Sequence, residues 1–290
     1  MPADPFTITL PARSGLLGLM ARIAAPVAAR AAGFDLCRAL YARLQGPSCE
    51  SFVDRVLRAL DIVPDCDPSR VLVIPERGGL IVASNHPSGA LDGLLLMSAI
   101  LRVRPDVRLL ANHLLAGVPE LAAISFFADP FGGKAASARS LSGLRAARRW
   151  VGDGGTLIAF PSGEVAHQRR NDGSYADSPW HTTVARLAMV SGAKIVPAFI
   201  AASNRRRFYA AGRVHGFLRT AMLPRELLAK RGERITIGLG AALWLDEPRL
   251  AGLDAVRLTQ HVREQVEALE VRHRRSRRRS DEQCEADSRS

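Results

Sequence analysis

Residues 81–96 read IVASNHPSGALDGLLL, and this stretch contains the signals of a strand, a turn and a helix in succession. The apolar run at its start is typical of a buried β-strand. Pro, Ser and Gly in the middle favour a tight turn, and the apolar residues around Asp92 predict a buried helix with an acid in its first turn. A strand, a turn and a helix in this order form the unit from which α/β sheets are built.

Short apolar runs bounded by turn residues recur on both sides of this stretch. Together with the run already described, they predict strands over residues 71–74, 79–84, 108–111, 124–128, 156–160, 195–201 and 235–238. Helical patterns are predicted between them, over residues 91–102, 135–151, 180–190 and 207–222. Because strands alternate with helices, we expect an α/β fold with a central, largely parallel sheet flanked by helices.

An N-terminal helical region precedes this pattern. Residues 14–45 carry apolar residues at helical spacing with Arg on another side, and Pro26 should kink or split the helix. An amphipathic segment of this kind suits a membrane interface, and it suits equally a helix that covers the core. A second helix is predicted over residues 51–60, followed by a loop over 62–70.

The C-terminal end has a different composition. A last helix over residues 252–272 is followed by a charged, Ser-rich tail that we expect to be disordered. The predicted organisation has four parts: an N-terminal amphipathic helical region at residues 1–65, a central α/β domain at 66–245, a C-terminal helix at 246–272 and the disordered charged tail at 273–290.

The net charge of the chain limits the kinds of binding partner to consider. The chain of 290 residues has 40 basic and 28 acidic side chains, a formal net charge of +12. Such a balance favours an anionic partner: a nucleic acid, an anionic membrane surface or an anionic substrate. Only one aromatic pair, Phe208 and Tyr209, adjoins an Arg cluster, so a base-stacking surface for nucleic acid is disfavoured.

Other classes of protein are excluded by motifs that the sequence lacks. The four cysteines form no CxxC pair and no zinc spacing, which excludes a zinc ribbon and a disulfide scaffold and favours a reducing compartment. No run of 18 apolar residues occurs, so no transmembrane helix is predicted. No GxSxG motif occurs, which disfavours a serine hydrolase.

His86 has the surroundings that a catalytic base needs. It follows a predicted strand, and open α/β sheets place their ligand crevice at the carboxyl ends of parallel strands. Asp92 is close enough to accept a hydrogen bond from one imidazole nitrogen, which leaves the other nitrogen to accept a proton. The alternative is that Asp92 is only a favourable charge at a helix N-terminus and His86 a loop histidine. His113 also follows an Asn, but no Asp lies within reach, so we interpret it as structural.

A second strand-and-turn segment, residues 154–166, reads GGTLIAFPSGEVA. Gly163 allows the backbone to approach a ligand closely, and exposed N–H groups at such a turn bind anions. The alternative is an ordinary tight turn. Since both turns follow buried strands, we expect them to face each other across one crevice.

Together these segments resemble the glycerolipid acyltransferases, the superfamily that includes 1-acylglycerol-3-phosphate acyltransferase. Its hallmark is Asn-His followed by Asp, which matches Asn85, His86 and Asp92, and a later Phe-Pro-x-Gly block. The blocks that are similar to the family lie at residues 85–92, 118–134, 160–163 and 195–199. Because all four keep the family's order, the resemblance implies that residues 66–245 form an acyltransferase domain with the fold of that superfamily.

Three departures from the family pattern bear on the branch and on the acceptor: the first indicates one branch of the superfamily, and the other two disfavour lysophosphatidic acid as the acceptor. Five residues separate His86 from Asp92 where four are usual, and this longer form is similar to the branch labelled haemolysin, which includes ornithine-lipid O-acyltransferases. Pro130 stands where phosphatidic-acid-forming enzymes have an Arg that helps to hold the acceptor phosphate. Ser162 replaces the usual Glu of the third block, and Glu164 comes two positions later.

The resemblance also implies a mechanism and a set of site residues. His86, oriented by Asp92, would remove a proton from an acceptor hydroxyl, which would attack an acyl thioester. Backbone N–H groups near the two turns would hold the oxyanion. The expected catalytic residues are His86 and Asp92, and the expected substrate-binding residues are Asn85, Ser162, Gly163, Glu164 and Lys134. No metal and no bound cofactor are expected, since the acyl donor, acyl-CoA or acyl carrier protein, is itself a substrate.

The predicted function is O-acyl transfer from an acyl thioester to the hydroxyl of a lyso-lipid, such as lyso-ornithine lipid, in membrane lipid synthesis. We expect a peripheral protein on the cytoplasmic face of the inner membrane. Its expected partners are the lyso-lipid, acyl-CoA or acyl carrier protein and the membrane surface, and not nucleic acid. Two alternatives stay open: a 1-acylglycerol-3-phosphate acyltransferase that makes phosphatidic acid, and a non-enzymatic basic protein that binds lipid or nucleic acid.

Overall fold

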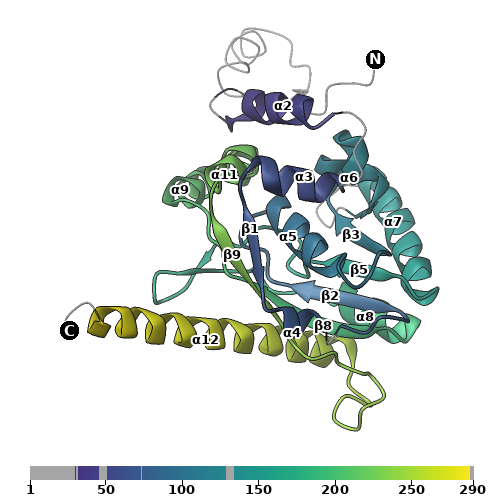
Figure 1. Ribbon diagram of the computed structural model, residues 1–290. Coiled ribbons are helices and arrows are strands. Elements are labelled where there is room, and N and C mark those ends of the chain that lie inside the picture. The colour runs from purple at the N-terminus through teal and green to yellow at the C-terminus, as the bar shows by residue number, and fades with distance from the viewer. Residues whose placement is uncertain (1–29, 31, 46–50, 73, 129–133, 288–290) are drawn as a thin grey trace.

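The computed structural model describes residues 30, 32–45, 51–72, 74–128 and 134–287. The amphipathic pattern at the start of the chain lies, up to residue 29, outside the described residues. A sheet of seven strands forms the middle of the molecule, and helices cover both of its faces (Figure 1).

The sheet has the strand order β1-β9-β8-β2-β5-β3-β4, so β2 is the central strand. Its strands are β1 (Val63–Cys66), β2 (Leu80–Ser84), β3 (Val107–Ala111), β4 (Ser125–Phe127), β5 (Thr156–Ala159), β8 (Lys194–Ile200) and β9 (Arg234–Leu239). All neighbouring strands are parallel except β8 and β9, which are antiparallel. The predicted α/β class, with a largely parallel central sheet flanked by helices, is confirmed. A separate two-stranded hairpin is formed by β6 (Gln168–Arg169) and β7 (Tyr175–Ala176).

The burial of β2 explains why helices pack on both faces of the sheet. Successive side chains of a strand point to opposite faces, so Leu80 and Val82 join one core and Ile81 and Ala83 join the other. The first core includes side chains of α3 (Phe52–Ala59) and α5 (Ala90–Ile100). The second includes side chains of α7 (Lys134–Gly152), α8 (Thr183–Ser191) and α12 (Ala255–Asp287).

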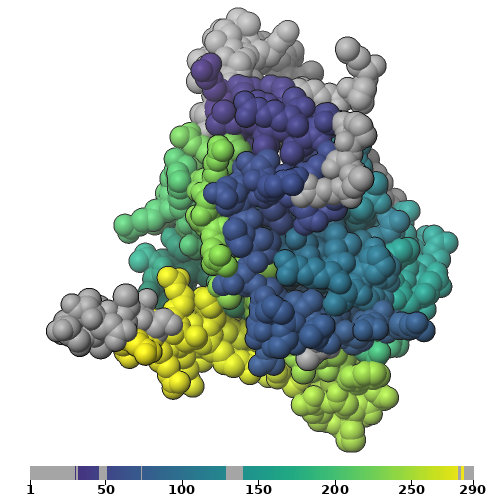
Figure 2. Space-filling view, in the orientation of Figure 1, coloured from purple at the N-terminus to yellow at the C-terminus, as the bar shows by residue number. Residues whose placement is uncertain are grey.

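The remaining helices are short. They are α2 (Phe34–Arg43), α4 (Pro68–Val71), the 3-10 helix η1 (His113–Gly117), α6 (Pro119–Ala123), α9 (Arg206–Val214), α10 (Gly216–Ala221) and α11 (Leu223–Ala229). Figure 1 shows α2, α9 and α11 at one end of the molecule, whereas α12 runs along the opposite side. The space-filling view shows the same separation of the purple and yellow ends of the chain (Figure 2).

Two predictions near the start of the sheet are wrong. Residues 68–71 form helix α4 in place of the strand predicted over 71–74, because Pro68 is at the first helical turn and the Asp67 carboxylate accepts a hydrogen bond from the Ser69 N–H at 2.9 Å. The loop predicted over 62–70 contains β1, which pairs with β9 at the edge of the sheet. Its sequence, VPDC, has no apolar run, and an edge strand tolerates its proline.

The helices of the C-terminal half also differ from expectation. The single helix predicted over 207–222 is two helices, because His215 has an extended backbone between α9 and α10. Residues 273–287 are helical as part of α12, so the disordered tail expected there is wrong over this range. Ion pairs one turn apart, such as that of Glu270 with Arg274 at 2.8 Å, favour the longer helix. The division of the chain into four parts stays a prediction, and β1 places residues 63–65 in the sheet.

Candidate active site

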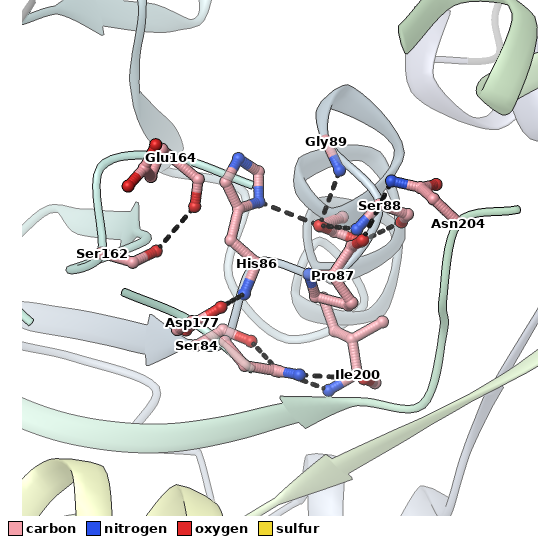
Figure 3. Close-up of polar contacts among 12 residues, drawn as sticks. Ser84, His86, Pro87, Ser88, Gly89, Ser162, Glu164, Asp177, Ile200 and Asn204 are labelled. Atoms are coloured by element: carbon pink, nitrogen blue, oxygen red, sulfur yellow. Dashed lines mark hydrogen bonds and ion pairs between the residues drawn. The ribbon is translucent and has the colours of Figure 1, made fainter. Parts of the chain in front are cut away.

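The loop that joins β2 to α5, residues 85–89, carries His86 and is called the His86 loop below (Figure 3). Asn85 fixes its start: the Asn85 amide nitrogen donates to the Ile200 carbonyl at 3.1 Å, and the amide oxygen accepts from the Ile200 N–H at 2.8 Å. The Ser84 hydroxyl donates to the same oxygen at 3.2 Å. Asn85 was expected to bind substrate. Since both ends of its amide bond the end of β8, its contacts favour a role in joining two strand ends.

Asp92 lies in the first turn of α5 and is fully buried. Its carboxylate accepts hydrogen bonds from the backbone N–H groups of Ser88 at 2.9 Å and Gly89 at 3.0 Å, and from the Ser88 hydroxyl. Gly89 precedes the helix with a φ of 94°, a conformation that favours glycine. These donors, together with the positive end of the helix, stabilise the ionised carboxylate in a buried position.

His86 turns one edge of its ring toward this carboxylate. The Nδ1 atom lies 2.9 Å from an Asp92 oxygen, and the His86 side chain is 16% exposed. A carboxylate is an acceptor only, so it favours the tautomer in which Nδ1 carries the proton and Nε2 has a free lone pair. The Phe160 ring stacks on the imidazole at a centroid distance of 4.1 Å and restricts its rotation. His86 therefore has the geometry of an oriented general base.

A second carboxylate supports the backbone of the His86 loop. Asp177 accepts a hydrogen bond from the His86 backbone N–H at 3.0 Å and another from the Trp180 indole N–H at 3.0 Å. Figure 3 shows Asp177 on the side of the His86 backbone away from the ring. Burial raises the pKa of Asp177, although the hydrogen bond from His86 opposes that shift. Asp177 was not predicted as a site residue.

The second turn, residues 161–164, lies beside the His86 ring, opposite the first turn of α5 (Figure 3). Ser162 is fully buried, and its hydroxyl donates to the Glu164 carbonyl at 2.9 Å. Gly163 has a φ of 70°, and its N–H donates to the Phe160 carbonyl at 3.0 Å. The two turns flank the His86 ring, and the crevice expected between them stays a prediction; the Ser162 hydroxyl is used within its own turn.

The Glu164 side chain is held by partners from two other segments. One carboxylate oxygen accepts from the Ser178 hydroxyl at 2.5 Å, and the other accepts from the Arg219 guanidinium at 2.8 Å. The side chains of Glu164 and Arg219 are 27% and 12% exposed. The predicted site residue Glu164 therefore belongs to a partly buried ion pair whose basic member, Arg219 of α10, the sequence did not indicate.

Several backbone N–H groups expected to hold an oxyanion already have partners in the protein. Ser88 and Gly89 donate to Asp92, and His86 donates to Asp177. The Gly163 N–H donates to Phe160, and the Ala166 N–H donates to the His86 carbonyl at 2.8 Å. These five N–H groups stabilise the two loops, so the expectation that they bind the oxyanion is not supported by their geometry.

The other predicted residues lie farther from this arrangement. Lys134 is the first residue of α7, and its side chain is outside the described part of the structure. His113 lies in η1, where its ring stacks on Phe127 at a centroid distance of 5.2 Å and its Nε2 is buried with no hydrogen-bond partner among the described residues. Its apolar surroundings agree with the structural interpretation.

No cluster of three or more His, Cys, Asp or Glu side chains that suits a metal ion occurs among the described residues. Among the same residues, none of the helices is long and apolar enough to cross a membrane.

Comparisons with known proteins place the chain in a family. The chain is similar to the crystal structure of the 1-acyl-sn-glycerophosphate acyltransferase PlsC from Thermotoga maritima, with 18% sequence identity and a TM-score of 0.46, over 88% of this chain and 94% of that one. No curated protein matches the chain at a significant level. A family model described as acyltransferase matches residues 49–275. Because this match covers most of the chain, including residues 85–92 and 161–164, the chain belongs to the acyltransferase family.

Proposed function

We propose that this acyltransferase transfers a fatty acyl chain from an acyl thioester to the hydroxyl of a lyso-lipid, with His86 as the general base. The observation that carries the proposal is the 2.9 Å contact between His86 Nδ1 and the buried Asp92 carboxylate, just beyond the carboxyl end of the central strand β2. Membership of the acyltransferase family disfavours the non-enzymatic alternative.

The chemistry follows from the tautomer that Asp92 favours. Nε2 of His86 takes the proton from the acceptor hydroxyl as the oxygen attacks the thioester carbonyl carbon. Asp92 stabilises the imidazolium that forms. When the tetrahedral intermediate collapses, the C–S bond breaks and the proton passes from Nε2 to the leaving thiolate. The products are an ester and a free thiol, and the donor is acyl-CoA or acyl carrier protein.

We further propose that the acceptor carries a zwitterionic headgroup, such as that of lyso-ornithine lipid. Glu164 and Arg219 form a fixed pair of opposite charges beside the crevice. A zwitterion complements such a pair, with its ammonium toward Glu164 and its anionic group toward Arg219. A phosphate monoester has no ammonium, and its negative charge is repelled by the Glu164 carboxylate. The sequence supports the same conclusion, because Pro130 stands where phosphatidic-acid-forming enzymes have an Arg that helps to hold the acceptor phosphate.

One observation favours the alternative acceptor, lysophosphatidic acid. Arg219 supplies a guanidinium on the Glu164 side of the crevice, and Arg binds phosphate well. If Arg219 were to leave Glu164 for a ligand, it would replace the Arg missing at Pro130. The product would then be phosphatidic acid.

The deciding experiment presents both acceptors to the enzyme with one acyl donor and measures catalytic efficiency from thiol release. We expect lyso-ornithine lipid to give the higher kcat/KM. A higher value for lysophosphatidic acid would replace the ornithine-type assignment with the alternative. Absence of transfer to any lyso-lipid, from either acyl-CoA or acyl carrier protein, would contradict the proposed function itself.

The proposed place of action is the cytoplasmic face of the inner membrane, with the protein bound peripherally. A net charge of +12 suits an anionic lipid surface, and the acceptor is a lipid. Release of the protein from sedimented membranes by high salt together with detergent is the expected behaviour, because both charge and apolar contact contribute.

A further inference from the structure

The turn between α9 and α10 presents large apolar side chains to solvent. Val214, Phe217 and Leu218 are 78%, 57% and 44% exposed, and we call these three residues the apolar tip. His215 and Gly216 between them are exposed too, and a side chain built on Gly216 would meet nothing within 4 Å. Exposed apolar residues scattered singly are ordinary, but three within five positions form a patch.

Basic side chains surround the apolar tip. Residues 201–225 contain six Arg and no Asp or Glu. Arg207 and Arg219 are engaged by Glu226 and Glu164, at 3.4 Å and 2.8 Å. Arg206 and Arg213 are exposed. Apolar side chains flanked by Arg are the composition of segments that bind the interface of anionic membranes, where the apolar groups enter the acyl boundary and the Arg side chains meet headgroups.

The apolar tip is rigidly connected to the crevice. Leu218 is followed by Arg219, which bonds Glu164, and in α9 the buried Phe208 and Tyr209 pack against Val165, the residue after Glu164. The Tyr209 hydroxyl accepts from the Asn204 N–H at 3.1 Å, and the Asn204 amide donates to the carbonyl of Pro87 in the His86 loop at 3.2 Å. The apolar tip is therefore linked to both loops of the site through a chain of direct contacts.

We propose that the apolar tip inserts into the headgroup region of an anionic membrane and so holds the crevice at the lipid surface. The inference rests on the proposed function, because the surface it assigns is the one from which a lyso-lipid would enter. An acidic protein is disfavoured as the occupant, since an acidic partner would pair with the Arg residues and leave the apolar side chains without a role. The Arg-rich end of α12 is less suited, because the exposed Arg residues there, such as Arg275, Arg278 and Arg279, are not accompanied by an apolar cluster among the side chains that the structure describes.

The test places a fluorescent reporter in the apolar tip of the full-length protein. Phe217→Trp and the matched control Val190→Trp are mixed with phosphatidylglycerol vesicles whose acyl chains carry bromine, which quenches tryptophan on contact. Val190 is 63% exposed and lies on α8, which packs on the sheet. Trp150, Trp180 and Trp244 give the same background in both proteins. We expect additional quenching for Phe217→Trp and none for Val190→Trp. Equal quenching of the two variants, or none in either, would overturn the proposal.

A binding measurement complements the quenching. The double variant Phe217→Ser/Leu218→Ser should bind phosphatidylglycerol vesicles about tenfold or more weakly than the wild type, whereas Val190→Ser should bind like it. Unchanged binding of the double variant would overturn the proposal, as would a Phe217→Trp signal that responds to acyl carrier protein and not to vesicles. The vesicles contain neither donor nor acceptor. Failure of the proposed function would therefore appear separately, as intact vesicle binding without acyl transfer.

Discussion

The carboxylate of Asp177 accepts the backbone N–H of His86 at 3.0 Å, on the side of the chain opposite the imidazole. His86 is therefore held by two acids: Asp92 orients the ring, and Asp177 orients the backbone from which the ring projects. Both carboxylates are buried, with exposures of 0% and 6%, so each satisfies donors that would otherwise lie unpaired in the core.

Replacement of Asp177 should lower activity through the position of His86. Asp177→Ala leaves the His86 N–H and the Trp180 indole N–H without an acceptor, which should cost about 1–3 kcal/mol of stability for each. We expect kcat to fall about 10- to 100-fold with little change in KM.

Two further variants serve as controls. Asp177→Asn keeps one acceptor and should recover part of kcat. Asp172→Asn, at an exposed acid paired with Arg274, is the control. A kcat for Asp177→Ala equal to that of the control would show that the backbone contact does not position the base.

The raised pKa of Asp177 predicts how stability depends on pH. Its pKa lies above the ordinary value of 3.8, so the folded protein retains this proton at pH values where the unfolded chain has released it. The stabilisation from Asp177 is fully present below pH 3.8 and is lost as the pH rises through the raised pKa. The free energy of unfolding of the wild type, minus that of Asp177→Asn, should therefore decrease as the pH rises above 3.8 and through the raised pKa of Asp177. Denaturant titrations at several pH values measure this difference. A difference in the free energy of unfolding that grows with pH would contradict a raised pKa of Asp177.

Removal of the proposed base, His86, or of Asp92, the acid proposed to orient it, should stop acyl transfer. His86→Ala and Asp92→Asn should each lower kcat by about 10²- to 10⁴-fold. His113→Ala should retain activity, because His113 stacks on Phe127 and has no carboxylate partner among the described contacts. Thiol release with long-chain acyl-CoA or acyl carrier protein measures the rate. Circular dichroism establishes that each variant is folded. Substantial activity in folded His86→Ala would exclude His86 as the base.

The parts of the fold that were predictable are those whose signal is local. The strand β2 is buried on both faces, so its apolar run is visible in the sequence. The edge strand β1 has a burial pattern that is mostly intermediate and forms only because β9 lies beside it. Nothing within VPDC indicates that partner. Helix α12 continues to Asp287 on charged residues, a length that the apolar pattern did not predict.

The same distinction, between local signals and contacts made by distant segments, holds for the candidate site. His86 and Asp92 are six residues apart in one turn, and their contact was predictable from that spacing. Asp177 is 91 residues from His86, and Arg219 is 55 residues from Glu164. Both pairs are created by the packing of distant segments. The sequence around Asp177 and Arg219 carries no motif that would have indicated a role in the crevice.

A buried arginine at the other end of β2 should be essential for stability and not for chemistry. Arg104 is 2% exposed and binds the carbonyls of Pro75, Gly78 and Gly154 at 2.7–3.2 Å, in addition to the Asp106 carboxylate. Arg104→Met leaves these acceptors unpaired and should destabilise the protein by about 3–5 kcal/mol.

Arg102→Met, at an exposed position, is the control and should change stability by less than about 0.5 kcal/mol. Denaturant midpoints measure the stability of both variants. At a low temperature where Arg104→Met is still folded, its acyl-transfer activity should persist. Equal stability of the two variants would contradict this assignment.

The charge pair of Glu164 and Arg219 offers a test of the acceptor that is independent of the wild-type preference. In the wild type the two charges neutralise each other across 2.8 Å, so a phosphate monoester gains little net attraction. Glu164→Gln removes the repulsion and leaves Arg219 free to bind phosphate, while a zwitterion loses the partner of its ammonium. We expect kcat/KM to fall about tenfold for lyso-ornithine lipid and to rise for lysophosphatidic acid, since a charge-assisted bond is worth about 1.5–3 kcal/mol. Arg219→Gln is the matched control and should lower the efficiency with both acceptors, because each presents an anionic group. If Glu164→Gln lowers both efficiencies equally, the pair only holds the second turn in place, and the zwitterion argument loses its structural support.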